Sequence, residues 1–367
     1  MRDERASLQL FDLIAREWAM PSAARQITFN ASGSAVAFGC DDGSVHIAAT
    51  ADKAAPDSRI RRAVDTGRLT IAPRSKPFPP LKSADFTEGR TSPVVAHGAQ
   101  NFAFAKSSGR INTVTPGGTS VYLPPRAAGS ISALAVAPDG ETLAFACGAE
   151  VHLSTSAGTA RLAAPHGVTA LAFSPDGQTL AVAHGAGLFR WAPAQRGAGQ
   201  AALATPSAPV SITWRQDAHW LVACLREGGI AVLDAAGDSV ILHRAFPAPV
   251  RFAAFSMPAN AVLASGAFRV AGWYLDGESR DVQSGRSGLV LVDAIAASPN
   301  RNLVAVGYAN GLLSLAEIGG RAEILLREDT GAGVTALAWS ADGRFLAVAG
   351  ADGSAALVEF PESMFKS

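Results

Sequence analysis

The sequence of 367 residues contains little charge and few cysteines. Charged residues make up 17% of it, against about 25% in an ordinary soluble domain. The 31 basic and 31 acidic residues cancel, which excludes the strong positive field of a general nucleic-acid binder. The 3 cysteines are Cys40, Cys147 and Cys224. They cannot all pair with one another, which favours a reducing compartment.

Long apolar runs are missing as well. No segment approaches the ~18 consecutive apolar residues that a membrane-spanning helix needs. The charged start, residues 1–5, is not followed by the apolar stretch of a secretory signal. We therefore expect a cytoplasmic protein with no membrane association. The excess of Arg (26) over Lys (5) indicates a GC-rich bacterial source.

Motifs of catalysis and phosphate binding are absent too. The Gly-x-Ser-x-Gly turn of hydrolases does not occur, and neither does the Gly-x-x-x-x-Gly-Lys loop that holds phosphates. The 7 histidines show no i, i+2 or i, i+4 pairs. The sequence thus predicts no catalytic residue, no cofactor and no metal.

What the chain has in abundance is apolar residues (48%), with 36 Gly and 21 Pro. The apolar content excludes intrinsic disorder. Residues 168–184 recur almost position by position at 131–147 and 334–350. Weaker copies begin near residues 27, 94, 210, 250 and 292. The repeats start roughly 40 residues apart, except for one longer interval after the first.

Each repeat has the pattern of short antiparallel strands. In the copy at 168–184, two apolar segments flank the turn Ser174–Gly177, where Pro presets φ, Asp bonds the backbone and Gly allows positive φ. A second Gly- or Asp-rich turn and two further segments follow. Four short strands in about 40 residues are typical of a propeller blade. The sequence predicts an all-β, single-domain β-propeller with eight four-stranded antiparallel blades, or seven as the alternative.

The pattern resembles the WD-repeat family of β-propellers from about Glu17 to Phe360. The strand-turn-strand segments at 131–147, 168–184 and 334–350 carry the resemblance. The closing Trp-Asp dipeptide of the family is mostly absent, with Leu233-Asp234 among its nearest equivalents.

The repeats also predict the organisation of the chain. Residues 27–360 form the propeller, residues 361–367 a tail, and residues 1–26 a segment that supplies the closing strand. Within that segment, Glu17–Pro21 would complete the last blade. The alternating residues 8–12 would be either the real closing strand or an extra edge strand.

An insertion within residues 51–90 explains the long interval. It carries nine basic residues against five acidic ones and the Pro-rich run Pro77–Pro80. It is interpreted as a solvated loop whose residues 68–72 supply the fourth strand of blade 1, as a partner-binding segment, or as a degenerate blade. Its candidate contact residues are Arg61, Arg62 and Phe78.

We expect a non-catalytic scaffold that docks an unidentified protein or peptide, and that is monomeric on its own. Loops before first strands, and between second and third strands, would gather exposed Arg and aromatic side chains on one rim, as at interface hot spots. The candidates are Arg226, Arg251, Phe268, Arg269 and Tyr308. The alternative is an enzyme or ligand-binding propeller with a small molecule or metal in its channel. Nucleic-acid binding ranks third, resting only on the basic insertion.

Overall fold

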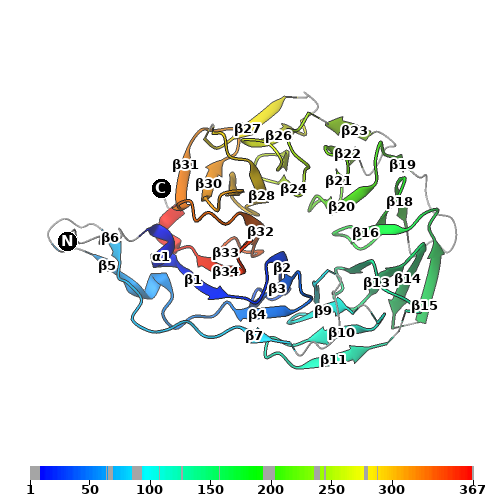
Figure 1. Cartoon of the computed structure of the whole chain (residues 1–367), viewed down its shortest axis with the longest axis horizontal. Helices are drawn as coiled ribbons and strands as arrows, with labels where there is room; N and C mark the ends of the chain where they lie inside the picture. Colours follow the sequence, from blue (N-terminus) through cyan, green and yellow to red (C-terminus); the bar gives the residue numbers. More distant parts are fainter. Residues whose placement is uncertain are drawn as a thin grey trace.

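The computed structural model shows a ring of eight four-stranded antiparallel blades within its described residues (Figure 1). The described residues are 9–62, 64, 69–84, 93–106, 108–124, 127–156, 158–192, 203–234, 240–243, 245–276, 280–286 and 288–365. The predicted fold class and the count of eight are confirmed. In each blade the strands follow one another from the channel to the periphery, except in the last, which also uses a strand from the N-terminus.

The first four blades follow the chain. Blade 1 contains β2 (Ala24–Phe29), β3 (Ala35–Cys40), β4 (Val45–Ala49) and β7 (Lys82–Ser83). Blade 2 contains β8 (Val95–His97), β9 (Asn101–Ala105), β10 (Ile111–Val114) and β11 (Ser120–Leu123). Blade 3 contains β12 (Ala133–Val136), β13 (Leu143–Cys147), β14 (Glu150–Thr155) and β15 (Gly158–Ala163). Blade 4 contains β16 (Val168–Phe173), β17 (Leu180–His184), β18 (Gly187–Trp191) and β19 (Leu203–Ala204).

The second four complete the ring. Blade 5 contains β20 (Pro209–Trp214), β21 (Trp220–Leu225), β22 (Ile230–Asp234) and β23 (Val240–His243). Blade 6 contains β24 (Ala253–Ser256), β25 (Ala261–Ala264), β26 (Val270–Tyr274) and β27 (Asp281–Ser284). Blade 7 contains β28 (Val292–Ala297), β29 (Leu303–Tyr308), β30 (Leu313–Glu317) and β31 (Glu323–Arg327). Blade 8 contains β32 (Val334–Trp339), β33 (Phe345–Gly350), β34 (Ser354–Glu359) and, outermost, β1 (Ala15–Ala19).

The two ends of the chain meet in blade 8. Strand β1 pairs antiparallel with β34, from Ala15 opposite Val358 to Ala19 opposite Ser354. Residues 8–12 are expected from the sequence to form either the closing strand or an extra edge strand. The structure contradicts both, because Leu10–Ile14 is the short helix α1. Leu8 lies outside the described residues. Phe11 and Ile14 fall on one face of that helix and are buried against blades 7 and 8, so tertiary burial overrides the alternating pattern.

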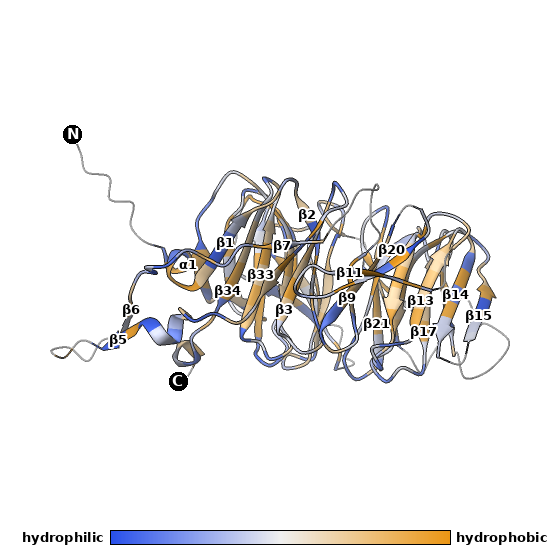
Figure 2. Ribbon diagram, turned by 90° about the horizontal axis from the view of Figure 1, so that it is seen from below, coloured by the Kyte–Doolittle hydropathy of each residue, from blue (hydrophilic) through white to orange (hydrophobic). Residues whose placement is uncertain are grey.

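The insertion is built differently from the prediction. Strand β6 (Leu69–Ile71) does not join blade 1, but pairs with β5 (Ile60–Arg62) in a hairpin that stands away from the ring (Figure 2). The short 3-10 helix Pro56–Arg59 leads into it. The fourth strand of blade 1 is instead β7, which pairs with His46 and Ile47 of β4. A two-stranded hairpin outside the ring is not a degenerate blade.

The base of the insertion lies on the closing strand. The side chains of Arg16 and Asp52, 3% and 4% exposed, approach to 3.9 Å, and Arg74 forms two hydrogen bonds to the Asp52 carboxylate, the longer at 2.9 Å. The Trp18 indole donates to the carbonyl of Pro79 at 2.8 Å. Both Arg16 and Trp18 belong to β1, so the insertion holds the strand that closes the ring.

Neighbouring blades are joined by side chains in their first strands or directly before them. Hydroxyls of Ser132 and Thr169 donate to the backbone carbonyls of Val168 and Pro209 in the following blades, at 2.8 and 2.5 Å. At the far end of the first strand, the Trp339 indole donates to Ala296 of the preceding blade at 3.0 Å. The recurrent aromatic position therefore serves blade-to-blade packing.

Candidate interaction surface

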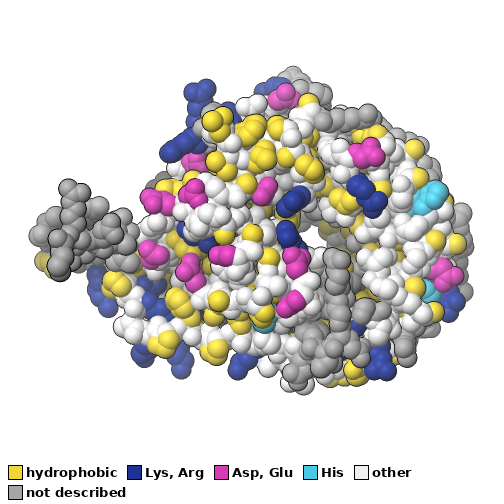
Figure 3. All heavy atoms as spheres, viewed as in Figure 1, with side chains coloured by type: hydrophobic (Ala, Val, Ile, Leu, Met, Phe, Trp, Pro, Cys, Tyr) yellow, Lys and Arg dark blue, Asp and Glu magenta, His cyan; other side chains and the backbone are white. Residues whose placement is uncertain are grey.

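Two sets of loops lie on one face of the ring, which we call the upper face. They are the turns between second and third strands (41–43, 226–229, 265–269, 308–312 and 350–353) and the connections that lead from one blade to the next, such as 285–291 and 328–333. Figure 3 shows hydrophobic side chains over blades 6 and 7, and Asp and Glu side chains over blades 7, 8 and 1.

The predicted rim residues differ in their solvent exposure and in their hydrogen bonds. Arg226 and Arg251 are exposed, and Phe268 is 41% exposed. Arg269 is half-buried, since its guanidinium donates to the carbonyl of Gly285 at 3.0 Å and to the side chain and carbonyl of Gln283 at 3.0 and 3.2 Å. Arg269 therefore fixes the connection after β27 rather than standing free.

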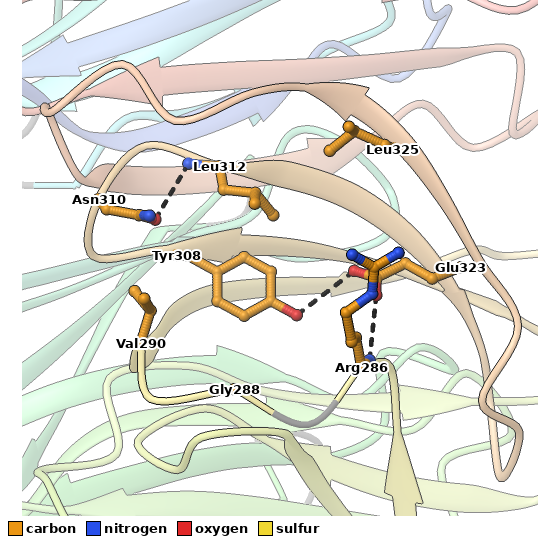
Figure 4. Close-up of a pocket in the computed structure, with 8 residues that line it drawn as sticks. All are labelled: Arg286, Gly288, Val290, Tyr308, Asn310, Leu312, Glu323 and Leu325. Atoms are coloured by element: carbon orange, nitrogen blue, oxygen red, sulfur yellow. Dashed lines mark hydrogen bonds between the residues drawn. The ribbon is translucent and has the colours of Figure 1, made fainter.

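Tyr308 corrects an expectation, because it is not an exposed rim residue. It is only 6% exposed, as the last residue of β29 with its ring next to the connection 288–290 (Figure 4). Its hydroxyl donates to Glu323 Oε1 at 3.4 Å. Burial, and then the neighbouring Glu323 carboxylate, raise the pKa of Tyr308 to about 12.

A hollow of about 160 Å³ opens over this ring, and we call it the Tyr308 pocket. Its lining residues are Arg286, Gly288, Val290, Tyr308, Asn310, Leu312, Glu323 and Leu325 (Figure 4). Val290, Leu312 and Leu325 supply apolar walls, and Glu323 a polar end, where its Oε2 also accepts the Arg286 backbone N–H at 3.0 Å. A comparable volume, about 150 Å³, holds a benzene ring in an engineered cavity.

Two leucines in or next to the segments that line the pocket are exposed. Leu289 is 93% exposed and Leu325 46% exposed. Sequence reasoning missed both. A usable signal was the run Leu289–Leu291, three apolar residues that the repeat spacing assigns to a solvent-facing connection. Of these three, Val290 and Leu291 are half-buried and Leu289 is exposed. An exposed leucine next to an apolar pocket is what an interaction surface requires.

A second hollow, of about 460 Å³, lies on blade 8, and we call it the acidic groove. Its lining residues are Glu17, Trp18, Ala19, Arg327, Thr330, Asp352 and Ser354. Arg327 is turned inward and donates to the Gly311 carbonyl at 3.3 and 3.1 Å. Burial lowers the pKa of Arg327, while the carboxylates of Glu17 and Asp352 oppose that shift.

The two hollows are neighbours. Asn310 lines the Tyr308 pocket and Thr330 lines the acidic groove, and the Thr330 N–H donates to the Asn310 carbonyl at 3.2 Å. The Asn310 side chain also donates to Asp329 at 2.8 Å. An apolar pocket and an acidic groove therefore lie on either side of one loop.

The three predicted contact residues of the insertion also differ in their exposure. Arg61 and Arg62 are exposed on the hairpin. Phe78 is half-buried, with the Arg74 guanidinium 4.9 Å from its ring centroid and the Trp18 ring 6.3 Å away. Phe78 thus contributes to holding β1, and only the two arginines project from the ring.

Among the described residues, no group of three His, Cys, Asp or Glu side chains is placed to hold a metal. All three cysteines are free thiols, and burial raises the pKa of Cys224 to about 11. Within the same part of the chain, no helix is long and apolar enough to cross a membrane.

Comparison with known proteins decides the family. Two family models match: the WD40 domain of anaphase-promoting complex subunit 4, over residues 295–364, and the WD domain, G-beta repeat, over residues 159–187. The chain is a WD-repeat β-propeller. A comparison with curated proteins by sequence found no match. Propellers of this family commonly mediate protein interactions.

Solved structures share the whole ring of this WD-repeat propeller. The computationally designed Ika8 protein is 18% identical, with a TM-score of 0.69 over 96% of this chain and 100% of its own. The Dos1 propeller is 13% identical, with a TM-score of 0.69 over 95% and 96%. The C-terminal WD40 domain of Sif2 is 12% identical, with a TM-score of 0.64 over 95% and 99%. At these identities the likeness establishes the fold alone.

Proposed function

We propose that this WD-repeat propeller is a non-catalytic scaffold whose upper face, over blades 6 and 7, docks a protein partner. The observation that carries the proposal is the exposed apolar side chains of Leu289, Leu325 and Phe268, which are 93%, 46% and 41% exposed. Leu325 lines the Tyr308 pocket, and Leu289 lies in the chain between Gly288 and Val290, which also line it. Interfaces depend on a few large side chains at their centre.

Arg226 and Arg251 are polar contacts at the margin of this surface. Both are exposed on the upper face of blades 5 and 6. Charged groups at an interface rim mainly set the association rate and its salt dependence. We expect their replacement to slow binding at low salt and to change affinity less than replacement of Leu289.

The hairpin β5–β6 is a second locus. Arg61 and Arg62 are exposed on it, beside Leu69, which is 53% exposed. Arg59 anchors its base by donating to the carbonyls of Ala54 and Leu13. An arm fixed at its base that presents two exposed arginines is suited to contact an acidic partner surface.

A quantitative pull-down from the native cell tests the proposal. Leu289→Asp represents the upper face and the double variant Arg61→Glu/Arg62→Glu the hairpin. Val121→Asp is the matched control, because Val121 is 55% exposed on the outer strand of blade 2. We expect Leu289→Asp to lose partners that Val121→Asp keeps. If neither the upper-face nor the hairpin variant changes the recovered proteins, the binding surface lies elsewhere.

Compartment and assembly belong to the same proposal. Three free thiols with no disulfide support a cytoplasmic location. We propose that the chain is a monomer until its partner binds, since its ring leaves no blade incomplete in the described residues. Sedimentation of the purified chain over a range of concentrations tests this.

A further inference from the structure

We propose that the upper face recognises a linear peptide segment that pairs one large apolar side chain with a nearby Lys or Arg. The apolar side chain enters the Tyr308 pocket, and the cation lies over the acidic groove. This inference rests on the docking function proposed above and specifies the chemistry of the partner.

The apolar anchor follows from the shape and lining of the Tyr308 pocket. A volume of about 160 Å³ suits a single large side chain rather than a folded surface. Val290, Leu312 and Leu325 line the pocket, and the Tyr308 ring forms its floor (Figure 4). The Glu323 carboxylate is occupied, because its two oxygens already accept hydrogen bonds from the Tyr308 hydroxyl and the Arg286 backbone N–H. An entering group therefore needs apolar surface more than hydrogen-bonding capacity.

The cationic anchor follows from charge. The acidic groove contains the carboxylates of Glu17 and Asp352 against one guanidinium, that of Arg327. The guanidinium is already directed to the Gly311 carbonyl. Glu328 and Asp329 add exposed carboxylates on the adjoining loop. A partner cation placed here meets an excess of negative charge, whereas an acidic side chain would be repelled.

The spacing of the two hollows specifies a segment of chain. They are separated by one loop, where Thr330 bonds the backbone of Asn310 at 3.2 Å. One extended stretch of peptide can therefore fill the pocket and reach the groove. Neither hollow alone distinguishes such a segment from other apolar or basic ligands, but the pair does.

Peptide-phage selection on the immobilised full chain is the direct test. We expect the selected peptides to share a large apolar residue with a Lys or Arg close to it in sequence. A synthetic copy of the most enriched peptide, carrying a fluorophore, then serves as the probe for binding measured by anisotropy. Selected peptides that are acidic, or that share no apolar residue, overturn the proposal.

Four variants locate the bound peptide. Leu325→Ser removes an apolar wall of the Tyr308 pocket and should weaken peptide binding about tenfold. Its control is Leu242→Ser, because Leu242 lies on the outer strand of blade 5 and is 37% exposed. This control should change peptide affinity less than about twofold. Glu17→Gln should weaken binding several-fold at low salt and little at high salt, and Glu227→Gln, on the upper face of blade 5, should have no effect.

Equal binding by all four variants overturns the assignment of the two hollows, even if peptides bind. Failure to select any peptide overturns recognition of a linear segment. That failure is distinguishable from failure of the docking function, which the pull-down with Leu289→Asp measures independently. Circular dichroism of each variant confirms that a loss of binding is not a loss of fold.

Discussion

The Arg16–Asp52–Arg74 cluster gives a stability prediction with a built-in control. Replacing Asp52 by Ala leaves the Arg16 guanidinium, 3% exposed, with its hydrogen bonds to the carbonyls of Ala49 and Thr50 but without the carboxylate at 3.9 Å. It also removes both hydrogen bonds from Arg74. Breaking one partner of a buried ion pair costs about 3–5 kcal/mol when the remaining charge is uncompensated. The Glu359 carboxylate also acts on Arg16, so we expect the lower end of that range.

The matched control is Asp41→Ala. Asp41 pairs with Arg25 at 2.9 Å, but both side chains are exposed, at 45% and 50%. An exposed pair contributes only about 0–1 kcal/mol. Urea unfolding followed by tryptophan fluorescence should therefore separate the two variants by at least about 2 kcal/mol in the free energy of unfolding.

A third variant tests the cause. In Arg16→Met/Asp52→Ala no guanidinium remains buried at this position of β1, so part of the stability lost in Asp52→Ala should return. In Asp52→Ala, the backbone amides of β1 should exchange hydrogen faster, before any such change appears in β20 of blade 5. If Asp52→Ala loses no more stability than Asp41→Ala, the insertion does not hold the closing strand and the reasoning fails.

The cluster also has a pH signature. Burial opposes ionisation of Asp52, but the Arg74 hydrogen bonds, the Ala54 N–H and the charge of Arg16 outweigh it and lower the pKa of Asp52 below its usual 3.8. The folded state thus binds fewer protons at this site than the unfolded chain. Its contribution is fully present above pH ~4 and is lost as the pH falls through the lowered pKa, so Asp52→Ala should flatten this part of the acid-unfolding curve.

Three other perturbations have defined outcomes. Deleting residues 1–22 removes β1 and leaves β34 as an open edge. The thermal unfolding temperature should fall by several degrees, or the protein should aggregate. An unchanged melting curve would refute the role of β1. Tyr308→Phe should remove a tyrosinate absorbance step near pH 12, and a wild-type titration without that step contradicts the buried placement of Tyr308. Gly307→Ala places a Cβ 2.5 Å from Val334 of the next blade and should cost about 1–3 kcal/mol of unfolding free energy, whereas Gly117→Ala, with its nearest neighbour at 3.6 Å, should cost less.

How much of this could be predicted depends on whether a feature repeats. The turn Ser174–Gly177 recurs in several blades and has local physical causes: the Ser174 hydroxyl donates to Asp176 at 2.5 Å, and Gly177 has φ +71. Such causes can be recognised from the sequence alone. The blade count and the aromatic position at Trp339 follow from the same repetition.

Features that occur once were not predictable in this way. The helix Leu10–Ile14 forms because Phe11 and Ile14 are buried by blades 7 and 8, which no local pattern reveals. Tyr308 is the last residue of β29, at the position that Gly350 has in β33 of blade 8, and the loop that lies against it belongs to the preceding connection. The Tyr308 pocket and the acidic groove both depend on such contacts between repeats.

The way in which the insertion holds β1 has a consequence for synthesis on the ribosome. Strand β1 is made first, but β34, with which it pairs, is made last. Closing so long a loop is entropically costly and slow. Asp52 and Pro79 emerge soon after Arg16 and Trp18, which they contact, so these bonds close much shorter loops. We therefore expect the insertion to give the first strand an early partner and to keep it beside blade 1 until the last blade is synthesised.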